Sequence, residues 1–175
     1  MRGTLTRHAT IAVLATVAVA GGIYAAGLRV NRTASLPLGI YWRTFAPLDR
    51  GSYVIFCPPA DNSAFALARE RHYIDYGNCK GRFATLLKRV VGLPGDQIDV
   101  DADGVRVNGV LLRNSAPLAA DRGGHALPIV RLHTNLPPQK LLLMSDYTPW
   151  SFDGRYFGLI PESAIQARVK PVWTW

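Results

Sequence analysis

Residues 86–96, Leu-Leu-Lys-Arg-Val-Val-Gly-Leu-Pro-Gly-Asp, place one lysine, Lys88, inside an apolar run that the core of a domain would bury. The Gly-Leu-Pro-Gly-Asp that ends the stretch cannot continue a regular strand, because glycine and proline interrupt it and aspartate favours a turn. We therefore expect a strand over residues 83–91 that ends in a fixed loop. Burial of a lysine on such a strand lowers its pKa and makes the neutral amine available as a general base. The alternative is that Lys88 and Arg89 are solvated charges on an edge strand.

A base needs a nucleophile, and Ser35 is the candidate. It stands in Thr-Ala-Ser-Leu-Pro-Leu-Gly-Ile-Tyr, residues 33–41. Proline and glycine here favour a chain reversal that holds a serine hydroxyl out from the backbone. Considered alone, a serine in such a stretch is more often a turn former.

Three stretches together resemble the bacterial type I signal peptidases, which use a serine–lysine dyad. Ser35-Leu36-Pro37 matches the serine motif of that family, and residues 88–96 match its lysine motif. Residues 145–146 and 151–158 match the third motif. The short chain, the form of the serine motif and the step Cys57-Pro58-Pro59 are most similar to the conjugative-transfer branch, which matures pilins.

The resemblance implies a mainly β domain of coiled antiparallel sheets, preceded by one N-terminal membrane helix. It also implies acyl transfer on an exported peptide. Neutral Lys88 would take the proton of Ser35, whose oxygen would attack the carbonyl that follows a small residue. The backbone N–H of Ser35 and the hydroxyl of Thr33 would stabilise the oxyanion.

Residues of the third motif would support this chemistry. Ser151 matches the serine that orients the lysine amine. Asp153 and Arg155 match an acidic and basic pair, and Asp153 also resembles the acidic residue that the conjugative branch needs for its transfer step. The alternative for all three is a satisfied loop network without direct chemistry. No cofactor and no metal site are predicted.

The implied substrate is a membrane-inserted pilin precursor, whose own amino terminus would resolve the acyl-enzyme to give a cyclic product. Neither composition nor spacing indicates cyclisation. A general signal peptidase that only hydrolyses preproteins is therefore an alternative. A third hypothesis is a non-enzymatic, membrane-anchored assembly factor of a conjugation apparatus, against which the intact Ser35 and Lys88 argue.

Composition limits the chain to one core. It has 175 residues, of which 49% are hydrophobic and 18% charged, too few for two ordinary domains. The formal net charge is +8, but the lysines and arginines are scattered, without an aromatic-interleaved basic stripe. We therefore expect attraction to anionic lipid and no nucleic-acid partner.

The N-terminal segment predicts export. Arg2, Arg7 and His8 precede a run without charge from Ile11 to Leu28. We expect residues 1–28 to anchor the chain in the inner membrane, with the peptidase domain of residues 29–175 facing the periplasm. The alternative is a removable signal, with Ala18-Val19-Ala20 as its cleavage site, which would leave a periplasmic domain.

The two cysteines, Cys57 and Cys79, form neither a metal set nor a C-x-x-C motif. In an oxidising compartment they could form one disulfide, and the alternative is two free buried thiols. Elsewhere, residue types predict a β-hairpin over residues 97–112, a surface excursion over 113–139 and a helix over 64–76 in which His72 is partly buried. Further strands are expected over 53–56, 140–144 and 164–172.

Overall fold

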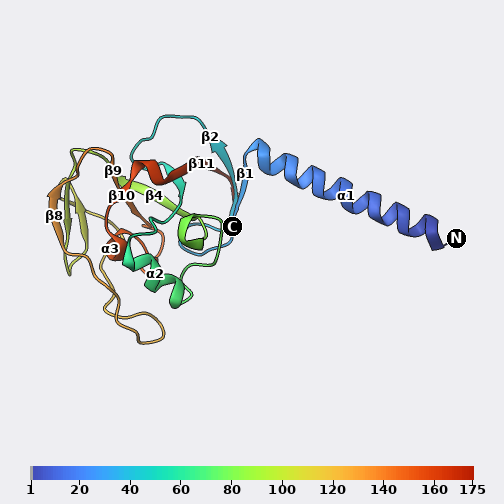
Figure 1. Cartoon of the computed structure of the whole chain (residues 1–175). Coiled ribbons are helices and arrows are strands. Elements are labelled where there is room, and N and C mark those ends of the chain that lie inside the picture. The colour runs from blue at the N-terminus through green and yellow to red at the C-terminus, as the bar shows by residue number, and fades with distance from the viewer. Residues whose placement is uncertain (1) are drawn as a thin grey trace.

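Two antiparallel sheets form the domain in the computed structural model, which describes residues 2–175 (Figure 1). The larger sheet has the strand order β1-β2-β11-β3-β4-β9-β10 and the smaller one the order β7-β6-β5-β8. The larger sheet consists of β1 (Leu28–Asn31), β2 (Gly39–Thr44), β3 (Tyr53–Phe56), β4 (Leu86–Gly92), β9 (Lys140–Met144), β10 (Ile160–Pro161) and β11 (Ile165–Thr174). The smaller sheet consists of β5 (Gln97–Val100), β6 (Val105–Val107), β7 (Val110–Leu111) and β8 (Leu132–Asn135). The predicted mainly β fold of antiparallel sheets is confirmed.

Strand β4 carries the lysine and lies between β3 and β9, with Lys88 opposite Val54 of β3. It is therefore an inner strand, which excludes the alternative of solvated charges on a sheet edge for Lys88. The loop that follows is fixed as expected: the Asp96 carboxylate accepts a hydrogen bond from the Leu93 N–H at 2.6 Å and one from Arg50 at 2.7 Å.

Two cores lie on either side of the domain. One packs α2 (Ser63–Glu70) and α3 (Gly154–Phe157) on the larger sheet, and its aromatic centre is the stacked pair Phe65 and Phe157, with ring centroids 4.8 Å apart. The other fills the space between the smaller sheet and the β4–β9 region, around Ile98 and Leu142. Strand β4 contributes Val90 to the first core and Val91 to the second, so Lys88 lies on the strand that both cores share.

Strand β11, the last of the chain, is paired on both sides by early strands. It contacts β2 through pairs such as Val169 with Arg43, and β3 through pairs such as Val169 with Tyr53. The chain therefore places its C-terminal strand between β2 and β3, which are neighbours in sequence but not in the sheet.

The helix predicted over residues 64–76 is shorter than expected. It begins after Asn62, whose side chain accepts a hydrogen bond from Ala64 N–H, and it ends at Glu70. His72 has a φ of +58°, in the left-handed region, so a right-handed helix cannot continue through it. His72 is exposed and lies outside the helix, which corrects the prediction of a partly buried helical histidine.

Several other segments differ from the expectation or complete it. Strands β1 and β2 flank the serine stretch, and β8 lies inside the predicted surface excursion, which is therefore more regular than its composition indicates. The 3-10 turns η1 (Lys80–Arg82) and η2 (Glu162–Ala164) were also not predicted. The hairpin over residues 97–112 is present as β5, β6 and β7, with Asn108 and Gly109 both at positive φ, as the Asn-Gly turn predicts.

The N-terminal helix α1 (Arg2–Ala26) projects away from the domain, on the side opposite the smaller sheet (Figure 1). Within residues 2–175, no helix is both long enough and apolar enough to cross a membrane. The predicted membrane anchor is therefore not confirmed and stays a prediction.

The two cysteines are joined. Cys57, directly after β3, forms a disulfide with Cys79, with the Cα atoms 5.5 Å apart. The bond closes a loop with a sequence separation of 22 that contains α2 and the segment up to η1. The alternative of two free thiols is thereby excluded.

Candidate active site

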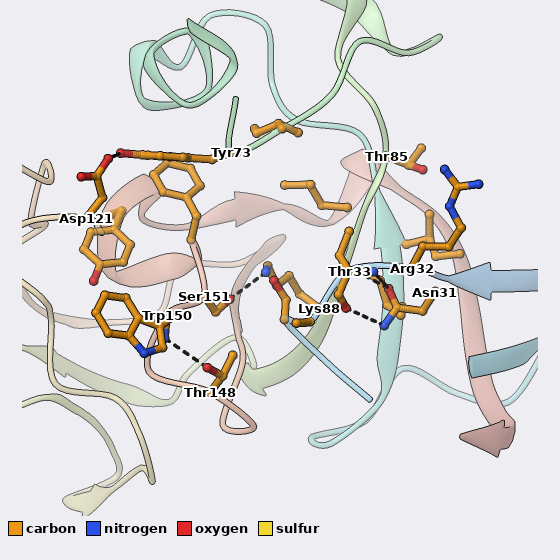
Figure 2. A pocket seen from close by; sticks show the side chains of 18 of the residues that line it. Asn31, Arg32, Thr33, Tyr73, Thr85, Lys88, Asp121, Thr148, Trp150 and Ser151 are labelled. Atoms are coloured by element: carbon orange, nitrogen blue, oxygen red, sulfur yellow. Dashed lines mark hydrogen bonds between the residues drawn. The ribbon is translucent and has the colours of Figure 1, made fainter. Parts of the chain in front are cut away.

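A cavity of about 780 Å³ lies where the serine stretch, β4, the loop after β9 and the surface excursion meet (Figure 2). Ser35, Lys88 and Ser151 all line it. Its lining also includes apolar side chains such as Leu86 and Phe152. A mostly apolar cavity with a few convergent polar groups is the usual form of a binding or active site.

Lys88 is buried, as the sequence predicts. Its side chain projects from β4, the residue is 2% exposed, and Nζ donates a hydrogen bond to Ser151 Oγ at 2.8 Å (Figure 2). The pKa of Lys88 is lowered to about 8, chiefly by burial; the Asp153 charge opposes this shift and the Arg155 charge adds to it. At pH 7 roughly a tenth of the amine is thus neutral, far more than for a solvated lysine, and the neutral form is the one that general base catalysis requires.

Asn31 organises the turn that carries Ser35. At the end of β1 and 7% exposed, it directs Nδ2 to the carbonyl oxygens of Thr33, Leu36 and Pro37, at 3.0, 3.1 and 2.9 Å. Its Oδ1 accepts from the backbone N–H of Thr33 at 3.2 Å and from the Thr33 hydroxyl at 3.0 Å. The buried side-chain amide of Asn31 therefore fixes the backbone of the turn before and after Ser35. Pro37 and Gly39 alone do not fix the conformation of this turn.

Ser35 is half-buried within this turn. Ser35 and Lys88 line the same cavity, but among the described residues Lys88 Nζ is hydrogen-bonded to Ser151 and not to Ser35. Catalytic hydrogen bonds are often long or poorly aligned without substrate, so this geometry is compatible with the predicted dyad. The Thr33 hydroxyl, predicted as an oxyanion donor, is directed at Asn31.

Asp153 and Arg155 form an ion pair with both side chains fully buried. Arg155 Nε lies 2.8 Å from Asp153 Oδ1, and Nη2 lies 2.9 Å from Oδ2. Arg155 also donates to the carbonyl oxygens of Asn114, Ala116 and Ser151. Neither member of the pair is among the residues that line the cavity. The pair thus contacts the site indirectly, through the hydrogen bond from Arg155 to Ser151, which does line the cavity.

Ser145 joins the pair to the serine turn. It is fully buried, and its Oγ donates to the carbonyl oxygen of Ser35, while its backbone N–H donates to Asp153 Oδ2 at 3.1 Å. Asp146, the next residue, forms an ion pair with Arg89 at 2.5 Å. The start of the third motif is thus attached both to the turn that carries Ser35 and to the strand that carries Lys88.

The surface excursion supplies a further wall of the cavity. Asp121 lines it and accepts a hydrogen bond from the Tyr73 hydroxyl, which holds the pKa of Asp121 below its ordinary range (Figure 2). The Arg122 guanidinium lies 4.7 Å from the centre of the Trp150 ring. The excursion therefore closes the end of the cavity that lies opposite Thr33.

Comparison with known proteins identifies the family. Residues 4–175 match the model of the family described as signal peptidase, peptidase S26. The chain belongs to this family. A plasmid transfer protein TraF of Escherichia coli is 48% identical over 166 residues, covering 94% of this chain and 93% of that protein. A second plasmid transfer protein TraF of the same organism is 44% identical, covering 98% of this chain and 97% of that protein. A conjugal transfer protein TraF of Agrobacterium fabrum is 38% identical, covering 85% and 84%.

Membership of the S26 signal peptidases confirms the family predicted from the three motifs and indicates a serine peptidase. No role was predicted from the sequence for two residues that support the site, Asn31 and Ser145. Asn31 carried a usable signal, because an asparagine before a turn often hydrogen-bonds the backbone two residues on. Ser145 carried none beyond its place at the start of the third motif, since its partner Ser35 is 110 residues away.

Proposed function

We propose that this chain is a serine endopeptidase in which Ser35 is the nucleophile and Lys88 its general base. The observation that carries the proposal is Lys88 itself: a lysine buried on an inner strand, hydrogen-bonded to a neutral hydroxyl, on the wall of the cavity that Ser35 also lines. Burial disfavours the ammonium form and lowers the pKa of a lysine, which is how an enzyme obtains a neutral amine near neutral pH.

Acylation then has two proton transfers. The Ser35 oxygen attacks the scissile carbonyl carbon and forms the new C–O bond, while the hydroxyl proton passes to Lys88 Nζ. Collapse of the tetrahedral intermediate breaks the C–N bond, and Lys88 returns the proton to the leaving amine. The product is an acyl-enzyme on Ser35, and a second nucleophile must attack this ester.

The oxyanion would form beside the backbone N–H of Ser35. Thr33 is the proposed second donor, and for this role its hydroxyl must rotate away from Asn31 Oδ1, its present partner. Loss of one such donor costs about 2.7–4 kcal/mol of transition-state stabilisation in well-studied cases.

The substrate that we propose is a pilin precursor of a conjugation apparatus. The relatives that match this chain over most of its length are plasmid and conjugal transfer proteins, and the matching family is described as signal peptidase. An oxidising compartment is supported by the Cys57–Cys79 disulfide, because such bonds persist in the periplasm and are rare in the cytosol. We therefore propose a catalytic domain that faces the periplasm, with α1 at the inner membrane.

The acyl-enzyme can be resolved by water or by the amino terminus of the pilin. We propose the second route, which gives a cyclic product and sets the chain apart from a general signal peptidase. The family resemblance implies a role for Asp153 in this transfer step. Its carboxylate is held by Arg155 and Ser145 and does not line the cavity, so any effect on transfer must pass through those partners.

Mass spectrometry of a candidate pilin made with this chain tests the proposal. A shortened product is expected with the wild-type chain and none with Ser35→Ala. A cyclic product is lighter than the hydrolysed one by one water, so the same spectrum separates the two routes. An unchanged precursor mass in the presence of folded wild-type chain would contradict the peptidase assignment for that substrate.

A further inference from the structure

We propose that Ser145 is a positioning residue for the nucleophile: its hydroxyl holds the carbonyl of Ser35 and so sets the direction of the Ser35 side chain. This inference rests on the proposed function, since it assigns a role to Ser145 in the same acylation step.

The hydrogen bonds of Asn31 hold several carbonyl oxygens of the serine turn but not the carbonyl oxygen of Ser35. Asn31 holds the carbonyl oxygens of Thr33, Leu36 and Pro37, on both sides of the nucleophile. The carbonyl of Ser35 itself accepts a hydrogen bond from Ser145 Oγ, and Ser145 lies directly after β9. Because the peptide unit is planar, fixing this carbonyl fixes the rotation of the chain just after the Ser35 Cα.

Ser145 is itself fixed. The residue is 0% exposed, its Oγ accepts a hydrogen bond from the Tyr147 N–H at 3.2 Å, and its own N–H donates to Asp153 Oδ2 at 3.1 Å. A hydroxyl that accepts one backbone donor and donates to one backbone carbonyl has little freedom to turn.

Two arms therefore start from the buried Asp153–Arg155 pair. One arm runs through Ser145 to the nucleophile turn. The other runs through the Arg155 Nη2 bond to the Ser151 carbonyl, at 3.1 Å, and from the Ser151 hydroxyl to Lys88. A single rigid support thus sets the nucleophile and the base relative to one another, as catalytic geometry requires.

Ser145 does not line the cavity and makes no hydrogen bond to Lys88. Its removal should therefore affect the placement of the Ser35 oxygen and leave both substrate contacts and the titration of the base unchanged. Misplacement by about 1 Å can cost roughly a hundredfold in rate.

The test uses the full chain and the p-nitrophenyl ester of N-acetylalanine, an activated substrate with a small acyl side chain. The first-turnover release of nitrophenolate reports acylation, and the mass of the Ser35 peptide reports its site. For Ser145→Ala we expect acylation roughly 10–100-fold slower than wild type, with KM changed by less than about threefold. The acidic limb of the pH profile should stay in place.

Ser115→Ala is the matched control. Ser115 is 2% exposed, its Oγ donates to the Leu112 carbonyl at 2.7 Å and accepts from the Val105 N–H at 3.0 Å, beside the smaller sheet. It thus has the same burial and the same kind of bonds as Ser145. Both alanine variants should lose similar stability in urea unfolding, and only Ser145→Ala should lose acylation rate.

Equal acylation rates in the two variants, within about twofold, would overturn the proposal, as would a shifted acidic limb in Ser145→Ala. If Ser145→Ala does not fold, Ser145→Cys keeps the side-chain size with a weaker S–H donor, and it should show a smaller loss of rate in the same comparison. If the wild-type chain is not acylated at Ser35, the proposed function itself fails, and this outcome is distinguishable because it does not depend on Ser145.

Discussion

Lys88 Nζ lies 2.8 Å from Ser151 Oγ, and both residues are almost fully buried. A serine hydroxyl can accept a hydrogen bond from the ammonium and can donate one to the neutral amine, so it holds the base in both protonation states. A carboxylate at the same place would favour the ammonium and raise the pKa of Lys88. The neutral partner therefore positions the amine without cancelling the effect of burial.

The dyad predicts the outcome of two single substitutions. Ser35→Ala and Lys88→Ala should each abolish processing and ester acylation, because one removes the nucleophile and the other its base. The double variant should be no slower than either single one, since the two residues act as a unit. First-turnover kinetics measure this. A rate above about one hundredth of wild type in either variant would disprove the assignment, because general base catalysis alone contributes roughly 10²–10⁴-fold.

The titration of Lys88 predicts how stability changes with pH. Its pKa is about 8 in the folded chain and near 10.4 in an unfolded one, so between these values the unfolded state binds more protons. Stability therefore rises with pH across this window, and the cost of burying the ammonium is fully present below it. Lys88→Met lacks this dependence.

Urea unfolding of both proteins from pH 7 to 10.5 measures the effect. The free energy of unfolding of wild type, relative to that of Lys88→Met, should rise by about 3 kcal/mol over this pH range. This change is expected whichever protein is the more stable at pH 7, because the loss of the Ser151 hydrogen bond in Lys88→Met only adds a constant. A constant difference would mean that Lys88 titrates normally. The acidic limb of the acylation rate should lie near the same pKa of about 8.

The Asp153–Arg155 pair predicts strong coupling. Asp153→Asn leaves the buried Arg155 cation without its partner and should lower the free energy of unfolding by about 3–5 kcal/mol. Adding Arg155→Gln should cost much less than Arg155→Gln costs alone, which a double-mutant cycle detects. Additive effects would show that the pair is not the common support of the site.

Asp153→Asn also separates the two roles proposed for this carboxylate. Asp153 raises the pKa of Lys88, so its removal should move the acidic limb of acylation to lower pH. As a support residue it should slow acylation itself. Normal acylation together with loss of the cyclic product would instead assign Asp153 to the transfer step.

The disulfide predicts a measurable loss on reduction. Closing a loop with a sequence separation of 22 restricts the unfolded chain and contributes about 3 kcal/mol. The loop carries Tyr73 and Ile74, which line the cavity. Cys57→Ala with Cys79→Ala should therefore lower both the free energy of unfolding and substrate affinity. An unchanged KM would indicate that α2 and η1 are held by their apolar packing alone.

The sequence was sufficient for the local features that short-range chemistry determines. The strand around Lys88, the Asn-Gly hairpin turn and the strands over residues 53–56 and 140–144 all follow from residue type and neighbours. The prediction of a helical His72 was wrong because the helical spacing of apolar residues continues past Glu70 in the sequence. The helix itself ends at Glu70, and the backbone at His72 is in the left-handed region.

Contacts between distant segments could not be predicted from residue types and spacing, and the contact between Lys88 and Ser151 was expected only from the family resemblance. Ser145 reaches Ser35 across 110 residues, and the excursion over 113–139 becomes a cavity wall through Asp121 and Tyr73, 48 residues apart. Composition indicates that such a segment is polar, but it does not indicate which other segments the folded segment will contact.

The position of β11 has a consequence for the order of events during synthesis. The strand that ends at Thr174 separates β2, which follows the nucleophile turn, from β3, which pairs with the strand of the base. A nascent chain therefore lacks the centre of its larger sheet until β11 has been synthesised, and sheets with such long-range pairing fold slowly. The serine turn and the strand of Lys88 are therefore joined through one continuous sheet only after β11, which follows both of them in the sequence, has paired with β2 and β3.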